Sequence, residues 1–291
     1  MTKNRILKMI AAIAVLALVL ILAGLLLPRS LDEAVWRYRT EPKRVAVLQY
    51  DQNDPPAFGV TLDEARTAEF MQKLKRLHGS YRGPFGRETE EAAPAGYVLR
   101  LYSTGYGEAE YGGESGFVMA DDSGMLTSSW GEIKKAVYHL GSSRQPFFDL
   151  CDSYLAPEGG YPGRAFLQEF FSVGKERWAI WESAVFSSDS SAMARAIEPY
   201  HAGLAPYVTP EILKRIELGR YLSSMELSCM AEARSWQILM IRVDEKSEPG
   251  CCNYWVDLRS TEEPYAYKTF SGSFVVHENG LICSFFVDLS E

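Results

Sequence analysis

The stretch Met9–Leu27 reads MIAAIAVLALVLILAGLLL and contains no charged residue. A helix rises about 1.5 Å per residue, so a helix of this length would span roughly the hydrocarbon core of a bilayer. Three cations precede the stretch, and cationic flanks stay on the cytoplasmic side. We therefore predict a cytoplasmic tail at residues 1–8, a transmembrane signal anchor at residues 9–27, and export of everything that follows.

The exit from this stretch favours an anchor over a cleaved signal peptide. It reads Ala-Gly-Leu-Leu-Leu-Pro, with bulky leucines where a signal peptidase needs small side chains. The sequence favours retention of the anchor and leaves open whether it is cleaved.

Composition indicates a globular, acidic body. The chain has 291 residues, of which 47% are hydrophobic and 23% are charged. The net charge is −8, and the first 29 residues hold four cations and no acidic residue, which leaves −12 for the rest. An acidic body argues against nucleic acid and against an anionic membrane surface as direct partners.

Glycine and proline placement predicts two domains. Residues 28–43 are charged and predict a short stalk. The segment Ala156-Pro-Glu-Gly-Gly-Tyr-Pro-Gly163 cannot continue a helix or a strand, which predicts a linker at 156–163. The linker separates a small β-rich α+β domain at 44–155 from a second α+β domain at 164–291.

Local patterns in the first domain predict both strands and helices. Strands are expected at 45–50 and 97–102, and a Gly/Pro-rich loop at 81–95. Thr61-Leu-Asp-Glu64 matches a capping box and predicts a helix that begins at Thr61. Residues 132–140 fit either a helix or an alternating strand, and we favour the strand because its neighbours are strands.

The second domain begins with helices and ends in a meander of strands. Thr209-Pro210-Glu211 combines a cap, a proline at the first helical position and an acid in the first turn. Strands are then expected from Ser235 onward, and Asn279-Gly280 is a strong signal for a two-residue hairpin.

Helices followed by an antiparallel meander resemble the NTF2-like superfamily. The resemblance covers roughly residue 165 to the C-terminus and depends on element order, on the Thr209–Glu211 helix start and on the closing turn Val276–Ile282. It implies a curved antiparallel sheet that encloses a cone-shaped cavity, and accessory or interaction roles in membrane-anchored proteins. The charged segment Asp244–Gly250 departs from that pattern, and the catalytic residues of the isomerase branch have no matching position here.

If such a cavity exists, five polar side chains could line it, and an Asp in an apolar cavity could act as a general base. The alternative is that Asp257 faces water, because it alternates with inward-facing residues. The candidate ligand-binding residues are Tyr200, His201, Tyr207, Tyr254 and Asp257.

Motifs for catalysis, metals and cofactors are missing from the sequence. It contains neither a Gly-x-Ser-x-Gly elbow nor a His-Glu-x-x-His motif, and its four histidines are widely spaced. The glycines at 105–107 and 112–113 lie between strands and are interpreted as turns rather than a phosphate loop. The five cysteines, whose pairing is open, show no CxxC spacing and are interpreted as small buried side chains. We therefore predict no metal and no cofactor.

Together these features predict a bacterial, single-pass, membrane-anchored extracytoplasmic protein. We expect a non-enzymatic binding or assembly module for envelope proteins or peptides. The alternative is a small-molecule or enzymatic site in the cone of the second domain. The identity of the partner and the oligomeric state stay open.

Overall fold

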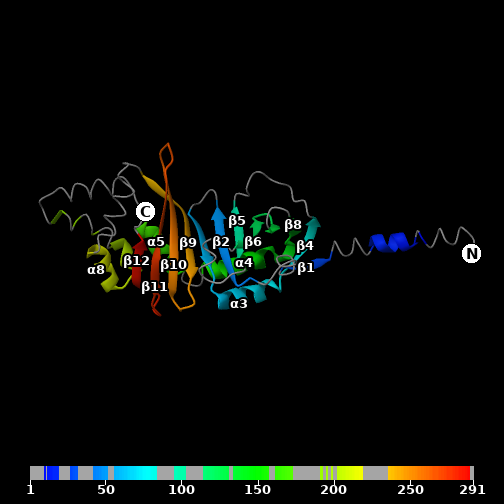
Figure 1. Cartoon of the computed structure of the whole chain (residues 1–291), viewed down its shortest axis with the longest axis horizontal. Coiled ribbons are helices and arrows are strands. Elements are labelled where there is room, and N and C mark those ends of the chain that lie inside the picture. The colour runs from blue at the N-terminus through cyan, green and yellow to red at the C-terminus, as the bar shows by residue number, and fades with distance from the viewer. Residues whose placement is uncertain are drawn as a thin grey trace, which may run out of the picture.

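A computed structural model describes residues 10, 12–19, 27–31, 42–51, 56–83, 95–102, 114–130, 134–156, 161–172, 191, 192, 195, 198, 202–218 and 235–288. Within these residues, one mixed sheet of twelve strands forms the body of the protein (Figure 1). From one edge to the other its order is β1-β4-β8-β7-β6-β5-β2-β3-β9-β10-β11-β12.

The first eight strands of the chain make one part of this sheet, and the last four make the other. The first part consists of β1 (Pro28–Ser30), β2 (Arg44–Asp51), β3 (Ala57–Thr61), β4 (His78–Gly83), β5 (Ala95–Tyr102), β6 (Glu114–Asp121), β7 (Met125–Trp130) and β8 (Lys134–His139). The second part consists of β9 (Trp236–Glu245), β10 (Cys251–Ser260), β11 (Tyr267–Val276) and β12 (Ile282–Asp288).

The two parts meet where β3 pairs with β9, and this pair is parallel whereas the other ten neighbouring pairs of the sheet are antiparallel. The expected fold class, an anchor helix followed by a small α+β domain and a separate NTF2-like α+β domain with its own curved antiparallel sheet, is therefore wrong. The C-terminal strands do form an antiparallel meander, but the meander continues the N-terminal sheet instead of closing around a cone.

Four helices cover one face of the sheet, which we call the helix face. They are α3 (Glu64–Leu74), α4 (Arg144–Leu155), α5 (Arg164–Phe170) and α8 (Pro210–Leu218). Alternation places apolar side chains of the strands on this face, as in β10, where every second residue is buried. The short 3-10 helix η3 (Gly141–Ser143) leads into α4.

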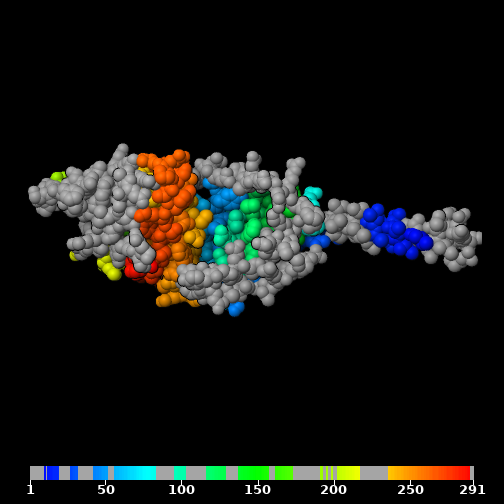
Figure 2. All heavy atoms as spheres, turned by 45° about the horizontal axis from the view of Figure 1, so that its top comes forward, coloured from blue at the N-terminus to red at the C-terminus, as the bar shows by residue number. Residues whose placement is uncertain are grey.

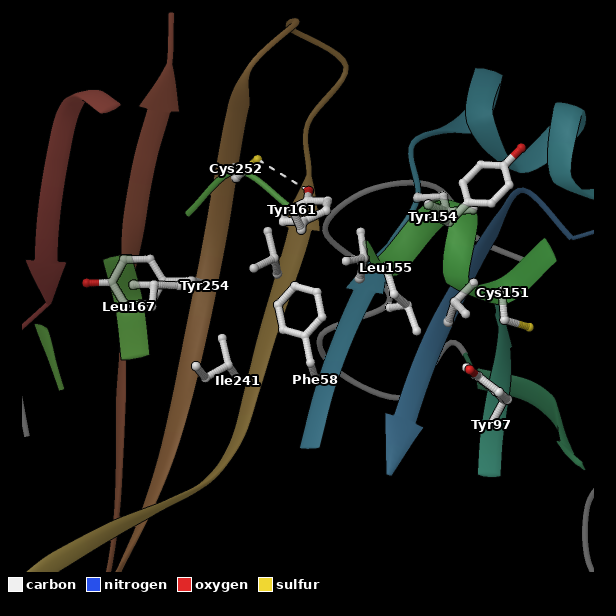
Figure 3. Packing of buried hydrophobic residues seen from close by; sticks show 14 of the residues in the cluster. Phe58, Tyr97, Cys151, Tyr154, Leu155, Tyr161, Leu167, Ile241, Cys252 and Tyr254 are labelled. Atoms are coloured by element: carbon white, nitrogen blue, oxygen red, sulfur yellow. Dashed lines mark hydrogen bonds between the residues drawn. The ribbon is translucent and has the colours of Figure 1, made fainter. Parts of the chain in front are cut away.

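A single hydrophobic core runs beneath the helices from one part of the sheet to the other. Figure 3 shows Phe58 of β3, Leu155 of α4 and Ile241 of β9 gathered around the junction, with Tyr161 beside them. The Phe58 and Tyr161 rings lie 5.5 Å apart between centroids. Tyr161 belongs to the segment predicted as a linker, and it is buried at the junction.

The described part of the N-terminal stretch does not form the expected transmembrane helix. Ile10 and residues 12–19 are helical, but among the described residues no helix is both long enough and apolar enough to cross a membrane. Met9, residue 11 and residues 20–26 lie outside the described part. The stretch leads directly into β1, so residues 28–30 of the predicted stalk are part of the sheet.

Gly163 sits at the N-terminus of α5 with a φ of 85°, and a Cβ there would lie 2.6 Å from Cζ of Phe274. A Gly163→Ala substitution should therefore combine left-handed backbone strain of about 1–2 kcal/mol with a steric clash of similar size. We expect the free energy of unfolding, measured in urea, to fall by the sum of the strain and the clash. Gly280→Ala is the matched control, because its φ is 82° and nothing lies within 4 Å of a Cβ there. Equal losses in the two variants would contradict the predicted clash.

Candidate functional site

The three predicted cavity residues that the structure describes, Tyr207, Tyr254 and Asp257, do not converge on one cavity. Tyr200 and His201 lie outside the described residues. Tyr254 is buried on the helix face, where its hydroxyl donates to the carbonyl of Phe286 at 3.1 Å. Asp257 is three positions further along β10 and points to the opposite face. Tyr207 lies before α8, and its carbonyl accepts from the Ile282 amide at 2.9 Å. Tyr254 and Asp257 therefore cannot share a site.

The charged groups that do converge lie at the end of the β3–β9 pair. Asp244 and Glu245 are consecutive residues of β9, so their side chains project from opposite faces of the sheet. Each forms an ion pair with an arginine from the N-terminal part: Asp244 with Arg44, and Glu245 with Arg66. We call these four residues the junction clamp. It ties the two parts of the sheet together on both faces at once.

Arg44 is the most buried residue of the junction clamp, with 2% of its surface exposed. Its Nε donates to the carbonyl of Leu62 at 3.1 Å. Its Nη2 donates both to the Asp244 carboxylate and, at 2.6 Å, to the carbonyl of Glu245. A guanidinium with these acceptors fixes the start of β2, the end of β3 and the end of β9 relative to one another.

Glu245 is the centre of the clamp on the helix face. Besides the ion pair with Arg66, its Oε1 accepts from the Tyr161 hydroxyl at 3.0 Å, and its Oε2 accepts from the Asp63 amide at 3.4 Å. Burial raises the pKa of the Glu245 carboxyl, while Arg66 and Tyr161 oppose that rise. Cys252 lies next to this group, with its Sγ 4.0 Å from the Tyr161 oxygen (Figure 3).

The buried thiols of the core and the Tyr161 phenol are poor nucleophiles. Burial, reinforced by the charge of Glu245, raises the pKa of the Cys252 thiol to about 12. Burial likewise raises the pKa of the Tyr161 hydroxyl and that of the Cys151 thiol well above their ordinary values. Because the thiolate is the reactive form, Cys252 stays protonated and unreactive at neutral pH.

Removing the Asp244 carboxylate should strongly destabilise the protein. Asp244→Ala leaves the Arg44 guanidinium buried without its counter-charge, and breaking a buried pair on one side costs roughly 3–5 kcal/mol. We expect that loss in the free energy of unfolding from urea denaturation. Asp122→Ala, at an exposed turn position, is the control and should change the free energy by less than about 0.5 kcal/mol. A loss below 1 kcal/mol for Asp244→Ala would contradict the clamp.

The raised pKa of Glu245 predicts a pH dependence of stability with a defined sign. The folded protein holds the Glu245 proton up to a higher pH than the unfolded chain does. Stability from this group is therefore complete below the ordinary value of 4.5 and is lost as pH rises through the folded pKa. We expect the stability of the native protein relative to Glu245→Gln to decline over that interval, measured by urea denaturation at a series of pH values. A relative stability that rises with pH would reverse the assigned direction.

The face of β9–β12 opposite the helices, which we call the outer face, carries a second cluster of charged and aromatic side chains. The Arg242 guanidinium lies over the Trp255 ring, 5.8 Å from its centroid, and its Nη2 is 3.5 Å from Oδ2 of Asp257. Asp257 also accepts from the Thr269 hydroxyl at 2.7 Å. Arg259 lies over the Tyr265 ring at 5.2 Å. Figure 2 shows that strands β9–β11, in gold and orange, reach the molecular surface.

Among the described residues, no group of three or more His, Cys, Asp or Glu side chains could hold a metal ion. The described cysteines, Cys151, Cys251, Cys252 and Cys283, are free thiols. Searches against family models, curated proteins and solved structures find no match for this chain. The comparisons therefore bear neither on the NTF2-like resemblance nor on the signal anchor.

Sequence reasoning missed the junction clamp and the outer-face cluster. The strict alternation of Trp255 and Asp257 with apolar residues places them on one face, so part of the outer face was readable. Nothing local signals that Arg44 meets Asp244, because the two residues are 200 positions apart.

Proposed function

We propose that this protein is a non-enzymatic binding module that attaches to the bacterial membrane through residues 9–27 and displays its sheet outside the cytoplasm to bind an envelope protein or peptide. The observation that carries the binding role is the cluster of arginine and aromatic side chains on the outer face. Membrane attachment is supported by the uncharged stretch and its cationic flank.

The chemistry of the outer face suits a protein partner. Trp, Tyr and Arg are the residues that contribute most binding energy at protein interfaces. Here they come together on β9–β11 and in the β10–β11 connection, and several aromatic rings of this face are open to solvent: the exposed fractions are 66% for Tyr267, 49% for Tyr265 and 52% for Phe286. The Trp255 and Tyr265 rings each pack against an arginine, so these side chains lose less freedom on binding than unpacked ones would.

The arginines of the outer face determine which kind of partner segment it binds. Arg242 and Arg259 are cations on an otherwise acidic body, and each is stacked on an aromatic ring. A stacked guanidinium keeps donors available for a carboxylate or a carbonyl of the partner. Beside them, the Asp257 carboxylate accepts from the Thr269 hydroxyl and orients the Arg242 guanidinium. The combination fits a polar peptide segment with acidic side chains.

In-membrane photocrosslinking tests this function. A photoreactive phenylalanine analogue in place of Tyr267, in the full-length protein in its native membrane, should form a discrete adduct with an envelope protein. The same analogue at the exposed Gln72 of α3 is the positional control and should form none. Equal adducts from both positions, or adducts with lipid alone, would contradict the proposal.

Substitutions on the outer face should weaken that adduct without unfolding the protein. Arg242→Ala and Trp255→Ala each remove an anchor of the kind that contributes about 1–2 kcal/mol or more, so adduct yield at limiting partner should fall about tenfold. Arg76→Ala removes an exposed cation after α3 and is the charge-matched control, with no expected change. If Arg76→Ala is as damaging as Arg242→Ala, overall charge and not this face governs binding.

A further inference from the structure

The position of β1 in the sheet determines how far the outer face stands from the membrane. β1 is one edge of the sheet and β12 is the opposite edge. Residue 27 ends the apolar stretch and residue 28 begins β1, so only one peptide bond separates the proposed membrane attachment from the edge of the sheet. Figure 1 shows β1 and the β11–β12 pair on opposite sides of the sheet along the long axis.

The attachment of β1 to the sheet is well built. β1 pairs antiparallel with β4 over three residues. Leu31 follows it, is fully buried in the common core, and donates its amide to the carbonyl of Leu77 at 2.8 Å. The Ser30 hydroxyl donates to the carbonyl of Lys75 at 2.9 Å, and Arg29 lies over the Tyr81 ring at 5.4 Å. These contacts hold β1 in a fixed position at the edge of the sheet.

Strand spacing converts this topology into a distance. Neighbouring strands lie about 4.8 Å apart, so the eleven steps from β1 to β12 correspond to roughly 50 Å. The sheet is continuous along that whole length, and the junction clamp secures the parallel step between β3 and β9. The acidic body opposes the alternative in which the sheet lies flat on an anionic bilayer.

We propose that β1 fixes one edge of the sheet at the membrane surface and that the sheet holds the outer face of β9–β12 about 40–50 Å away from it. This inference rests on the proposed membrane attachment. Its consequence for the partner is specific: the acidic segment that binds Arg242 and Arg259 belongs to an extracytoplasmic domain standing at that height. A membrane-embedded segment of a neighbouring protein cannot reach the face.

Energy transfer from the protein to labelled lipid tests the distance. The full-length protein is reconstituted into liposomes of phosphatidylcholine and anionic phosphatidylglycerol that contain an acceptor-labelled lipid, with a donor attached through a non-natural amino acid. Ser142 is the near position, because η3 contacts β4 through a bond from the His78 amide to the Ser143 hydroxyl at 3.1 Å. Asn279, exposed in the β11–β12 turn, is the far position.

We expect strong transfer from Ser142 and weak transfer from Asn279. Strong transfer from both positions means that the sheet lies flat, and weak transfer from both means that β1 does not sit at the bilayer; either result overturns the inference. Liposome flotation separates this failure from failure of the proposed function: protein that does not float with the liposomes is not attached at all.

A variant that weakens the attachment of β1 to the sheet provides the second measurement. Leu31→Ala removes the buried anchor behind β1 and leaves residues 9–27 unchanged. The time-resolved distance distribution from Ser142 should broaden in this variant, while flotation stays the same. Arg76→Ala, exposed nearby, is the control and should not broaden it. An unchanged distribution in Leu31→Ala would show that β1 does not set the position of the sheet.

Discussion

The parallel pairing of β3 with β9 is the constraint on which the rest of the structure depends. Five residue pairs join strands from opposite ends of the chain, and everything C-terminal to them is attached to the sheet at that step. Because this pairing is only five residues long, the ion pairs on both faces of the sheet reinforce it. On the helix face, the Phe58 and Tyr161 rings pack together against the same pair of strands. The β3–β9 pairing joins two smaller sheets into one continuous sheet of twelve strands.

Features with local causes could be predicted from the sequence. Helix α8 begins at Pro210, and a turn that contains Asn279 and Gly280 joins β11 to β12, because a cap and a turn depend on neighbouring residues only. The turn is longer than the two-residue hairpin predicted, since the His277 amide donates to the Leu281 carbonyl across three residues. The ambiguous segment 132–140 is strand β8, as its strand neighbours suggested. Helix α3 begins two residues later than predicted, with Asp63 as its cap, because Thr61 belongs to β3.

The features that decide the architecture have no local cause. β3 has five residues, follows a turn-rich segment and was not recognised, and its partner β9 lies about 180 positions away in sequence. β4 was interpreted in part as loop, and β1 as stalk. The resemblance to an NTF2-like domain followed from the order of elements, which is the same whether the meander curls into a cone or extends a neighbouring sheet. Only the pairing of β3 distinguishes the two outcomes.

The strand order also has a consequence for how the chain is made. Strands β1–β8 occupy adjacent places in the sheet and are complete when residue 139 has emerged, whereas β9 begins only at residue 236. During synthesis of the intervening residues β3 is an edge strand with unpaired backbone groups, the kind of edge that recruits foreign strands. Nascent chains are therefore most vulnerable to misassociation in this interval, and a chaperone that shields β3 would protect the protein before its last four strands add in sequence order.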